Sequence, residues 1–139
     1  MPSTGLKNAK FDMIHVYNTK FEDHTSNENN YYIGRSRGGN VLGNPYTYNG
    51  KRSNIAKLSF RTADEAIRAY GMYFDAMYGT DKEFTRQIDE IYEKYKNGEE
   101  VYLQCFCKPN PCHGDVIVDK LQQRLIKERL DEMKKASSS

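Results

Sequence analysis

The chain has 139 residues, the size of one ordinary domain, with 37% hydrophobic and 29% charged residues and a formal net charge of +2. Such a composition is typical of a soluble globular protein, and the net charge is too small to indicate nucleic-acid binding by itself. The sequence shows no apolar run of membrane-spanning length and no signal-peptide pattern, which excludes a membrane protein and predicts a cytoplasmic location. There the three cysteines are expected as thiols, metal ligands or catalytic groups.

The pattern of apolar and turn-forming residues predicts a single α/β domain over residues 11–135. A loose polar leader at 1–10 precedes it, and a frayed tail at 136–139 follows it. Residues 13–17 are expected to form a first strand and residues 31–33 a short second strand, because both are rich in β-branched and aromatic side chains and end at Asn or Gly.

Two amphipathic helices are expected in the middle of the chain. Thr62 and Glu65 have the spacing of a capping box, and the apolar stripe that follows them ends at Gly79. Asp81 is expected to cap the second helix, which ends at Gly98. The apolar residues of both helices recur every three or four positions, which indicates a face buried in the core.

Residues 101–107 give the strongest strand signal of the chain, and Asn110 with Pro111 predicts that a last helix begins directly after it. Together these elements predict a compact three-layer, Rossmann-like domain with a small, mostly parallel sheet. The first strand and the 101–107 strand would lie centrally, with helices on both faces.

A glycine-rich segment over residues 34–46 contains four glycines and two arginines. Glycines allow close backbone approach to a ligand, and guanidinium groups pair with anions, so Gly34 and Arg35 are candidates for phosphate binding. Asn44 and Pro45 indicate a rigid turn before Tyr46, because proline fixes its own φ and restrains the residue before it. A solvated surface loop is the simpler alternative, since the segment matches neither a P-loop nor a dinucleotide-binding fingerprint.

The segment from Cys105 to Asp115 holds all three cysteines and one of the three histidines, and three chemistries fit it. The first is anion binding, because the amides of Cys112, His113 and Gly114 would lie unpaired at the start of a helix, with Lys108 nearby.

The second chemistry is a metal site, and the third is nucleophilic catalysis. A Cys3His zinc set would consist of Cys105, Cys107, Cys112 and His113, although the usual C-x2-C pair is absent. Alternatively, Cys112 beside His113 would act as a thiolate nucleophile, with Asp115 or Asp119 orienting the histidine. Against all three stands the alternative that the cysteines are small packing residues at a tight turn.

The same residues carry a family resemblance. The run Cys105-x-Cys107-x-Pro109-x-Pro111-Cys112-His113-Gly114-Asp115, with the upstream motifs at residues 32–35 and 43–46, resembles domain of unknown function 4326, a family of phages and bacteria. The resemblance covers roughly residues 12–125. It implies a phage or bacterial origin and two motifs that meet in one pocket. The family pattern has Trp before Gly-Asn-Pro where this chain has Leu42, so stacking by that ring is not expected here.

From these observations we expect a pocket for a nucleotide or related phosphorylated ligand between the 34–46 loop and the 108–115 turn. The expected ligand-binding residues are Gly34, Arg35, Asn44, Pro45, Tyr46, Lys108 and Gly114. If the protein is an enzyme, transfer or hydrolysis would use Cys112, His113 and Asp115.

Two alternatives stay open at this stage. One is a non-catalytic binder that sequesters a host nucleotide signal, and the other is a zinc-stabilised interaction module. No organic cofactor and no membrane partner is expected. Nucleic-acid binding has weak support, because no recognition helix or RNA-reading motif is present, and homo-oligomerisation is left open.

Overall fold

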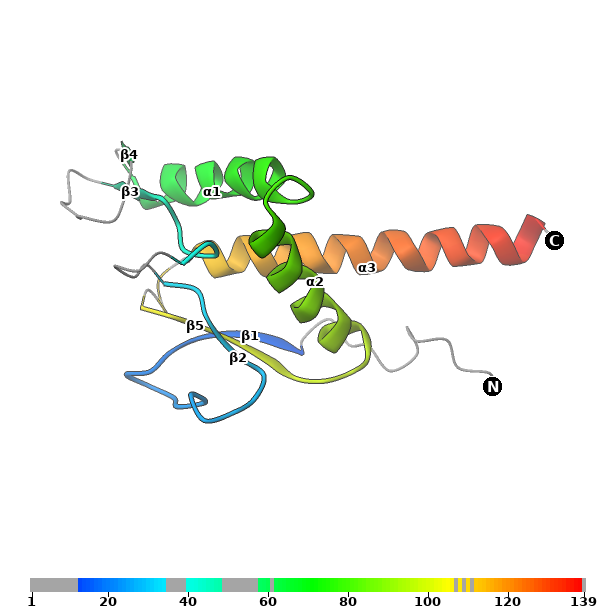
Figure 1. Cartoon of the computed structure of the whole chain (residues 1–139), viewed down its shortest axis with the longest axis horizontal. Coiled ribbons are helices and arrows are strands. Elements are labelled where there is room, and N and C mark those ends of the chain that lie inside the picture. The colour runs from blue at the N-terminus through cyan, green and yellow to red at the C-terminus, as the bar shows by residue number, and fades with distance from the viewer. Residues whose placement is uncertain are drawn as a thin grey trace.

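The computed structural model describes residues 13–34, 40–48, 58–60, 62–106, 108, 110 and 112–138. Figure 1 shows the arrangement of the elements. In chain order they are β1 (Ile14–Asn18), β2 (Asn30–Tyr32), β3 (Tyr46–Tyr48), β4 (Leu58–Phe60), α1 (Ala63–Met77), α2 (Lys82–Lys96), β5 (Val101–Cys105) and α3 (His113–Ser138). None of the helices in these ranges is long and apolar enough to cross a membrane.

The main sheet has three parallel strands in the order β1-β5-β2. Ile14 lies opposite Val101 on one side of β5, and Asn30 lies opposite Tyr102 on the other. The prediction of an α/β domain with a small parallel sheet is therefore confirmed. The expectation that the first strand lies centrally is wrong, because the short polar strand β2 pairs with the second edge of β5 and leaves β1 at the margin. A separate parallel pair, β3 with β4, packs against α1.

One face of this sheet packs against the helices. The β5 side chains on that face are all buried, namely Val101, Leu103 and Cys105. Tyr31 shares this face through its register with β5, and its hydroxyl donates to Glu90 of α2. Gly114, at the start of α3, lies against Val16 of β1, which also shares this face. Both α2 and α3 thus cover the same side of the sheet, and α1 packs behind α3.

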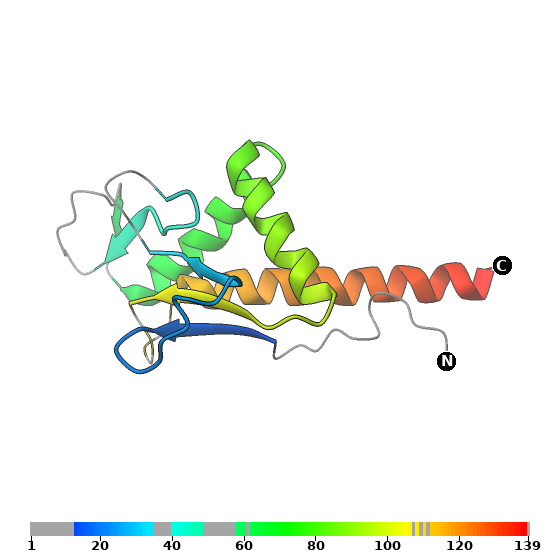
Figure 2. The same ribbon diagram turned by 60° about the horizontal axis from the view of Figure 1, so that its bottom comes forward.

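Aromatic rings cover the opposite face of the sheet. The Tyr102 ring stacks between His15, at 5.3 Å between ring centroids, and His24, at 4.0 Å. Tyr17 packs edge-on against His24 at 4.9 Å and is buried. Figure 2 shows the segment between β1 and β2 on the side away from α2. The expected helices on both faces, and with them the three-layer Rossmann-like arrangement, are not confirmed.

The local signals for α1 and α2 are confirmed in detail. Thr62 and Glu65 form the predicted capping box at the start of α1. Asp81 accepts the amide hydrogen of Phe84 at the start of α2. Gly79 follows α1 with φ of +87°, a conformation that favours glycine, and so stops the chain from continuing as helix.

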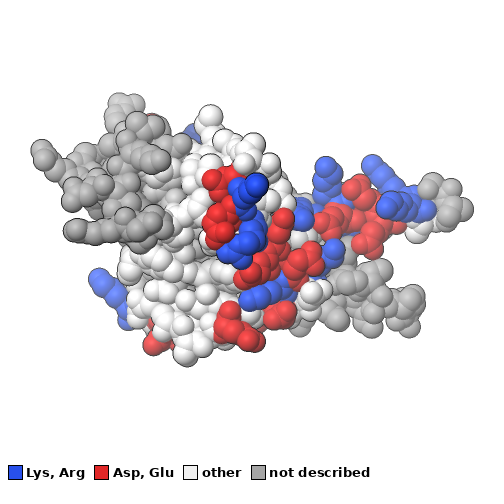
Figure 3. Space-filling model, viewed as in Figure 1, with Lys and Arg blue, Asp and Glu red and all other residues white. Residues whose placement is uncertain are grey.

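The outer surface of α2 carries charges of both signs. Figure 3 shows blue and red side chains interspersed over α2 and along α3 on the face in view. Arg86, for example, pairs with Glu83 at 2.7 Å and with Glu90 at 3.3 Å. Such exposed pairs contribute little to stability and give a solvated face rather than a strong single-sign field.

Candidate functional site

The turn that starts α3 is organised by two side chains. Cys112 Sγ accepts the amide hydrogen of Gly114 at 3.4 Å, and Asp115 Oδ2 accepts the amide hydrogen of Cys112 at 3.1 Å. In a capping box, the side chains of the residue before the helix and of the third helical residue accept each other's backbone amide hydrogens. Cys112 and Asp115 form a variant of that motif, in which a thiol replaces the usual hydroxyl and accepts from the second helical amide, that of Gly114, instead of the third.

These contacts correct one prediction about anion binding. The amides of Cys112, His113 and Gly114 were expected to lie unpaired at the helix start, where a phosphate would accept from them. Those of Cys112 and Gly114 donate within the chain instead, because the thiol of Cys112 and the carboxylate of Asp115 supply local acceptors. The carboxylate of Asp115 already supplies the negative charge that this helix end favours.

His113 joins the turn to the segment after β2. It is 7% exposed, and its Nε2 lies 2.7 Å from the carbonyl oxygen of Ile33. Because a carbonyl oxygen only accepts, Nε2 carries the hydrogen, and Nδ1 faces Cys112 Sγ at 3.7 Å. The predicted cysteine–histidine contact is present, but Cys112 is only 1% exposed. A dissolved substrate cannot reach that thiol without movement of the surrounding chain.

Gly114 allows α3 to approach the sheet closely. A Cβ atom at this position would lie 2.8 Å from Ile33 Cδ1 and 2.8 Å from Val16 Cγ1, both closer than real Cβ atoms approach. The expected role of Gly114 was to admit a ligand. In the structure the space beside it is filled by these two side chains.

The upstream motif is held by its own amide side chains. Asn40 Nδ2 donates to the carbonyl oxygens of Tyr32 and Gly34, each at 2.8 Å. Asn44 is buried, and its Nδ2 lies 3.4 Å from the carbonyl oxygen of Ala66. The two motifs contact each other at the His113–Ile33 hydrogen bond, among packed side chains. The pocket that the resemblance implied between them stays a prediction.

Three further residues of the upstream motifs were expected to contact the ligand, namely Pro45, Tyr46 and Arg35. Pro45 is half-buried and lies directly before β3. Tyr46 opens β3, but its side chain lies outside what is described, and Arg35 lies outside the described residues altogether. Their predicted contacts with a ligand stay predictions.

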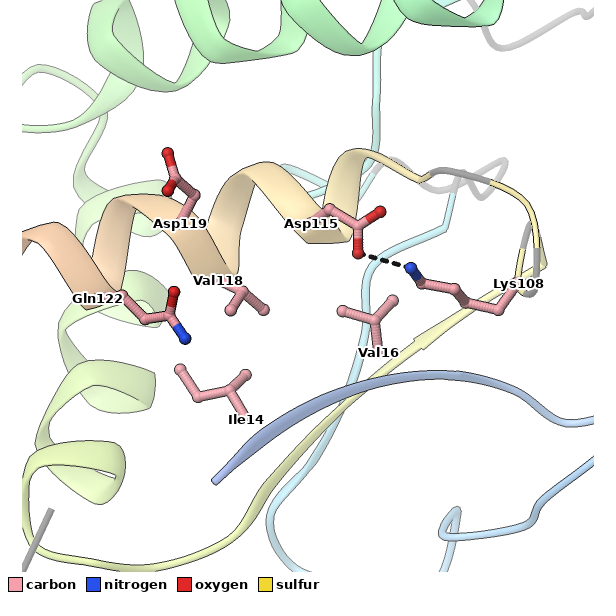
Figure 4. A pocket seen from close by; sticks show the side chains of 7 residues that line it. All are labelled: Ile14, Val16, Lys108, Asp115, Val118, Asp119 and Gln122. Carbon is pink, nitrogen blue, oxygen red and sulfur yellow. Dashed lines mark hydrogen bonds and ion pairs between the residues drawn. The ribbon is translucent and has the colours of Figure 1, made fainter. Parts of the chain in front are cut away.

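An open cleft lies on the other side of the same turn, between β1 and α3 (Figure 4). Its volume is about 280 Å³, and its lining residues are Ile14, Val16, Lys108, Asp115, Val118, Asp119 and Gln122. Lys108 Nζ lies 2.6 Å from Asp115 Oδ1 at one end of the cleft. Ile14 and Val16 of β1 form an apolar floor, and Val118 with the polar groups of α3 forms the facing wall (Figure 4).

A second cavity adjoins the first at Val16 and Lys108. It has a volume of about 220 Å³, and its lining residues are Val16, Tyr17, Asn18, Phe21, Glu22 and Lys108. Asn18 Nδ2 donates to the carbonyl oxygen of Lys108 at 3.1 Å, which ties the turn to the end of β1. Phe21 is 68% exposed and offers an open ring face. We call the two adjoining cavities the Lys108 cleft.

The buried phenol of Tyr17 stays neutral at this cleft. Burial raises its pKa, and the carboxylates of Asp23 and Glu22 raise it further, against a lowering hydrogen bond with the backbone of His24. Its hydroxyl donates to Asn30 Oδ1. Tyr17 therefore contributes shape and a fixed dipole to the cleft wall.

Sequence reasoning found part of this cleft. Lys108 and Asp115 were predicted as site residues, and Asp119 was named for a different role, orienting His113. Gln122 and Phe21 were missed. The spacing of Asp115, Asp119 and Gln122 does place them on one face of a helix and could have indicated a polar wall. That this wall faces β1 depends on long-range packing.

The predicted zinc set is only partly described. Cys105 and Cys112 are buried thiols, and Cys107 lies outside the described residues. Across the described parts of the chain, no group of three or more His, Cys, Asp or Glu side chains could hold a metal ion. The four-ligand site, which requires Cys107, stays a prediction.

Comparison with known proteins places the chain in a family. A family model described as Domain of unknown function (DUF4326) matches residues 16–123, and no curated protein or solved structure matches. The match includes both motifs and ends within α3, so it covers the turn at 112–115, the sheet except the first two residues of β1, and the Lys108 cleft except Ile14. The chain thus belongs to the DUF4326 family of domains of unknown function.

Proposed function

We propose that this domain binds a nucleotide or a related phosphorylated small molecule in the Lys108 cleft. One observation carries the proposal: Lys108 lines both cavities, and its side chain reaches Asp115 in the first. Lys108 follows the carboxyl end of β5, next to the carboxyl end of β1. In open parallel α/β sheets, ligands bind outside those strand ends.

The ammonium group of Lys108 is the proposed phosphate contact. Its ion pair with Asp115 is partly exposed, with side-chain exposures of 26% and 44%, and such pairs are worth roughly 0–1 kcal/mol. A ligand phosphate can therefore take over Lys108 at little cost. Asp115 remains held by the Cys112 amide through Oδ2, so its Oδ1 becomes available to a ligand hydroxyl.

The remaining lining groups suit a nucleoside. Carboxylates of Asp115 and Asp119 accept hydrogen bonds from sugar hydroxyls or base amino groups, and Gln122 both donates and accepts. A base can lie on the apolar floor or against Phe21. With one ammonium among three carboxylates, counting Glu22, the cleft suits a single phosphate better than a polyphosphate.

The surrounding groups favour binding over cysteine-based catalysis. The Cys112 thiol is 1% exposed and serves as an acceptor at the helix start. Asp115 is committed to the Cys112 amide, which leaves it as a poor partner for His113. We therefore infer that the ligand is held without covalent attachment to the chain.

The test is a calorimetric titration of the purified chain with the four common nucleoside monophosphates and the matching nucleosides. We expect at least one monophosphate to bind about tenfold more tightly than its nucleoside, because only the former engages Lys108. Lys108→Met should reduce the monophosphate to the affinity of the nucleoside.

Lys120→Met is the matched control. Lys120 pairs with Asp75 at 2.8 Å and has a side-chain exposure of 28%, close to the 26% of Lys108, but it does not line the cleft. An equal loss of affinity in both variants, or no binding of any monophosphate, would contradict the proposal.

A further inference from the structure

The Lys108 cleft consists of two cavities of similar size that share part of their lining. Their volumes are about 280 Å³ and about 220 Å³, and both are lined by Val16 and Lys108. Small-molecule sites in proteins usually have volumes of about 300–1,000 Å³. Each cavity alone falls short of that range, whereas the two together lie within it. A ligand that fills the cleft therefore needs two parts, one for each cavity, joined near the shared residues.

The first cavity has the features of a nucleoside site. Ile14 and Val16 of β1 form an apolar floor, and Val118 of α3 belongs to the facing wall (Figure 4). A base can pack on such a floor. In a nucleotide the sugar hydroxyls lie next to the phosphate, just as the Asp115 carboxylate lies next to Lys108 Nζ, at 2.6 Å. The cavity thus offers an acceptor for a sugar hydroxyl beside a cation for a phosphate.

The second cavity offers the same kinds of contact to a second nucleoside. The Phe21 side chain is 68% exposed, and aromatic rings on protein surfaces stack with nucleic-acid bases. Glu22 supplies a carboxylate that is 60% exposed and accepts hydrogen bonds. Asn18 fixes the boundary towards the first cavity, because its Nδ2 donates to the carbonyl oxygen of Lys108 at 3.1 Å.

The charges that line the two cavities favour a phosphate with a single negative charge. Among the described lining residues, Lys108 is the one cation, against the carboxylates of Glu22, Asp115 and Asp119. At pH 7 a terminal phosphate carries about 1.5 to 2 negative charges, whereas a phosphodiester carries one. A phosphodiester can therefore pair with Lys108 without placing an additional negative charge among the carboxylates.

We propose that the ligand of the Lys108 cleft is a linear dinucleotide, with one nucleoside in each cavity and its single phosphodiester on Lys108. This inference rests on the proposed function, because it keeps Lys108 as the phosphate contact and specifies what that phosphate joins. Asp115 accepts from a hydroxyl of the first nucleoside, and the second base stacks on Phe21. A cyclic dinucleotide has a second phosphodiester, for which the described lining provides no second cation.

The test is a calorimetric titration of the purified chain with the complete panel of linear 3′–5′ diribonucleoside monophosphates and with the corresponding nucleoside monophosphates. Joining two units makes binding of the second one intramolecular. We therefore expect at least one dinucleotide to bind about tenfold more tightly than its monophosphate half. Phe21→Ala should weaken the dinucleotide about tenfold and change the affinity for the monophosphate by less than about twofold. Lys108→Met should weaken both ligands about tenfold.

Phe106→Ala is the matched control for Phe21→Ala. Phe106 is 64% exposed, close to the 68% of Phe21, but it does not line the cleft. It should leave the affinity for the dinucleotide unchanged. Equal effects of the two substitutions would show that the second base does not lie on Phe21 and would overturn the inference.

The ligand panel separates failure of this inference from failure of the proposed function. Monophosphates that bind as tightly as every dinucleotide would overturn the inference and leave the proposed function standing. Absence of binding by both kinds of ligand would overturn both. An affinity that keeps rising from dinucleotides to trinucleotides and tetranucleotides would indicate a groove for single-stranded RNA, which also contradicts a site for two nucleosides.

Discussion

The turn at residues 112–115 separates two regions of opposite character. On one side, Cys112, His113 and Gly114 are buried and contact the segment after β2. On the other side, Lys108 and Asp115 are partly exposed and line the Lys108 cleft. We call the first the closed region. Both arise from one short motif, and the second borders the two cavities that the described residues line.

The difference teaches how residue types can mislead at such a turn. Cysteine and histidine are the common nucleophile and base, yet here their polar atoms are engaged in starting a helix and in joining two chain segments. The lysine and aspartate look like an ordinary ion pair, yet they border the open cavities. Burial and hydrogen-bond partners, rather than reactivity of the side chain, distinguish the two regions.

Of all the substitutions, His113→Ala should have the largest effect, which is a loss of stability. The substitution removes a buried ring and leaves the carbonyl oxygen of Ile33 without this donor, which should cost about 3 kcal/mol of unfolding free energy. Urea denaturation measures it. His15→Ala is the control, since His15 is partly exposed and should cost less than about 1 kcal/mol. Equal losses would contradict the structural role of His113.

The second-largest effect is expected from Gly114→Ala, which should lower the unfolding free energy through the closed region. The new Cβ would overlap Val16 and Ile33, and overpacking of this kind costs about 1–3 kcal/mol. Gly71→Ala offers a control of opposite sign. Gly71 lies within α1, and its Cβ would meet only Val116 Cγ1 at an ordinary 3.8 Å. Because alanine favours helix, that variant should gain about 0.5–1 kcal/mol. Thermal unfolding compares the two.

Substitutions of Cys112 distinguish a helix cap from a nucleophile. Cys112→Val removes the acceptor for the Gly114 amide and should cost about 1 kcal/mol, while Cys112→Ser keeps an acceptor and should cost less. Neither should change the affinity for a phosphorylated ligand by more than about twofold, since the thiol does not line the cleft. Loss of binding in Cys112→Ser would place the ligand in the closed region after all.

The smallest expected effect on stability is that of Lys108→Met. The variant loses one partly exposed ion pair, which is worth about 0–1 kcal/mol. Its large effect should appear only in the ligand titration described above. If Lys108→Met instead destabilised the fold as much as His113→Ala, Lys108 would belong with the closed region and the comparison would fail.

Local signals in the sequence predicted the three helices and the strands of the main sheet, but not the strand pair of β3 and β4. What depends on packing between distant segments could not be predicted. Thr62 and Asp81 identified the helix starts because capping depends on neighbouring residues only. The edge position of β1 could not be predicted, since it depends on β2 pairing with the far side of β5. The covering of one sheet face by aromatic rings around Tyr102 depends likewise on contacts between distant segments.

The site was predicted in part for the same reason. The motifs singled out the 112–115 turn, and they named Lys108 and Asp115, which line the cleft. They could not show that Asp115 would cap the helix through the Cys112 amide, because cysteine is not among the usual capping residues. Nor could they show that β1 would supply Val16, and the segment after β1 Phe21, to the cleft.

The most direct test of the central claim is an NMR titration of the ¹⁵N-labelled chain with a nucleoside monophosphate. Because the two regions lie on opposite sides of one turn, the perturbed amides report which of them binds. We predict the largest shifts at residues 16–22, 108 and 115–122, around the Lys108 cleft. Shifts confined to residues 33–34 and 40–45 would place the ligand at the closed region and contradict the account.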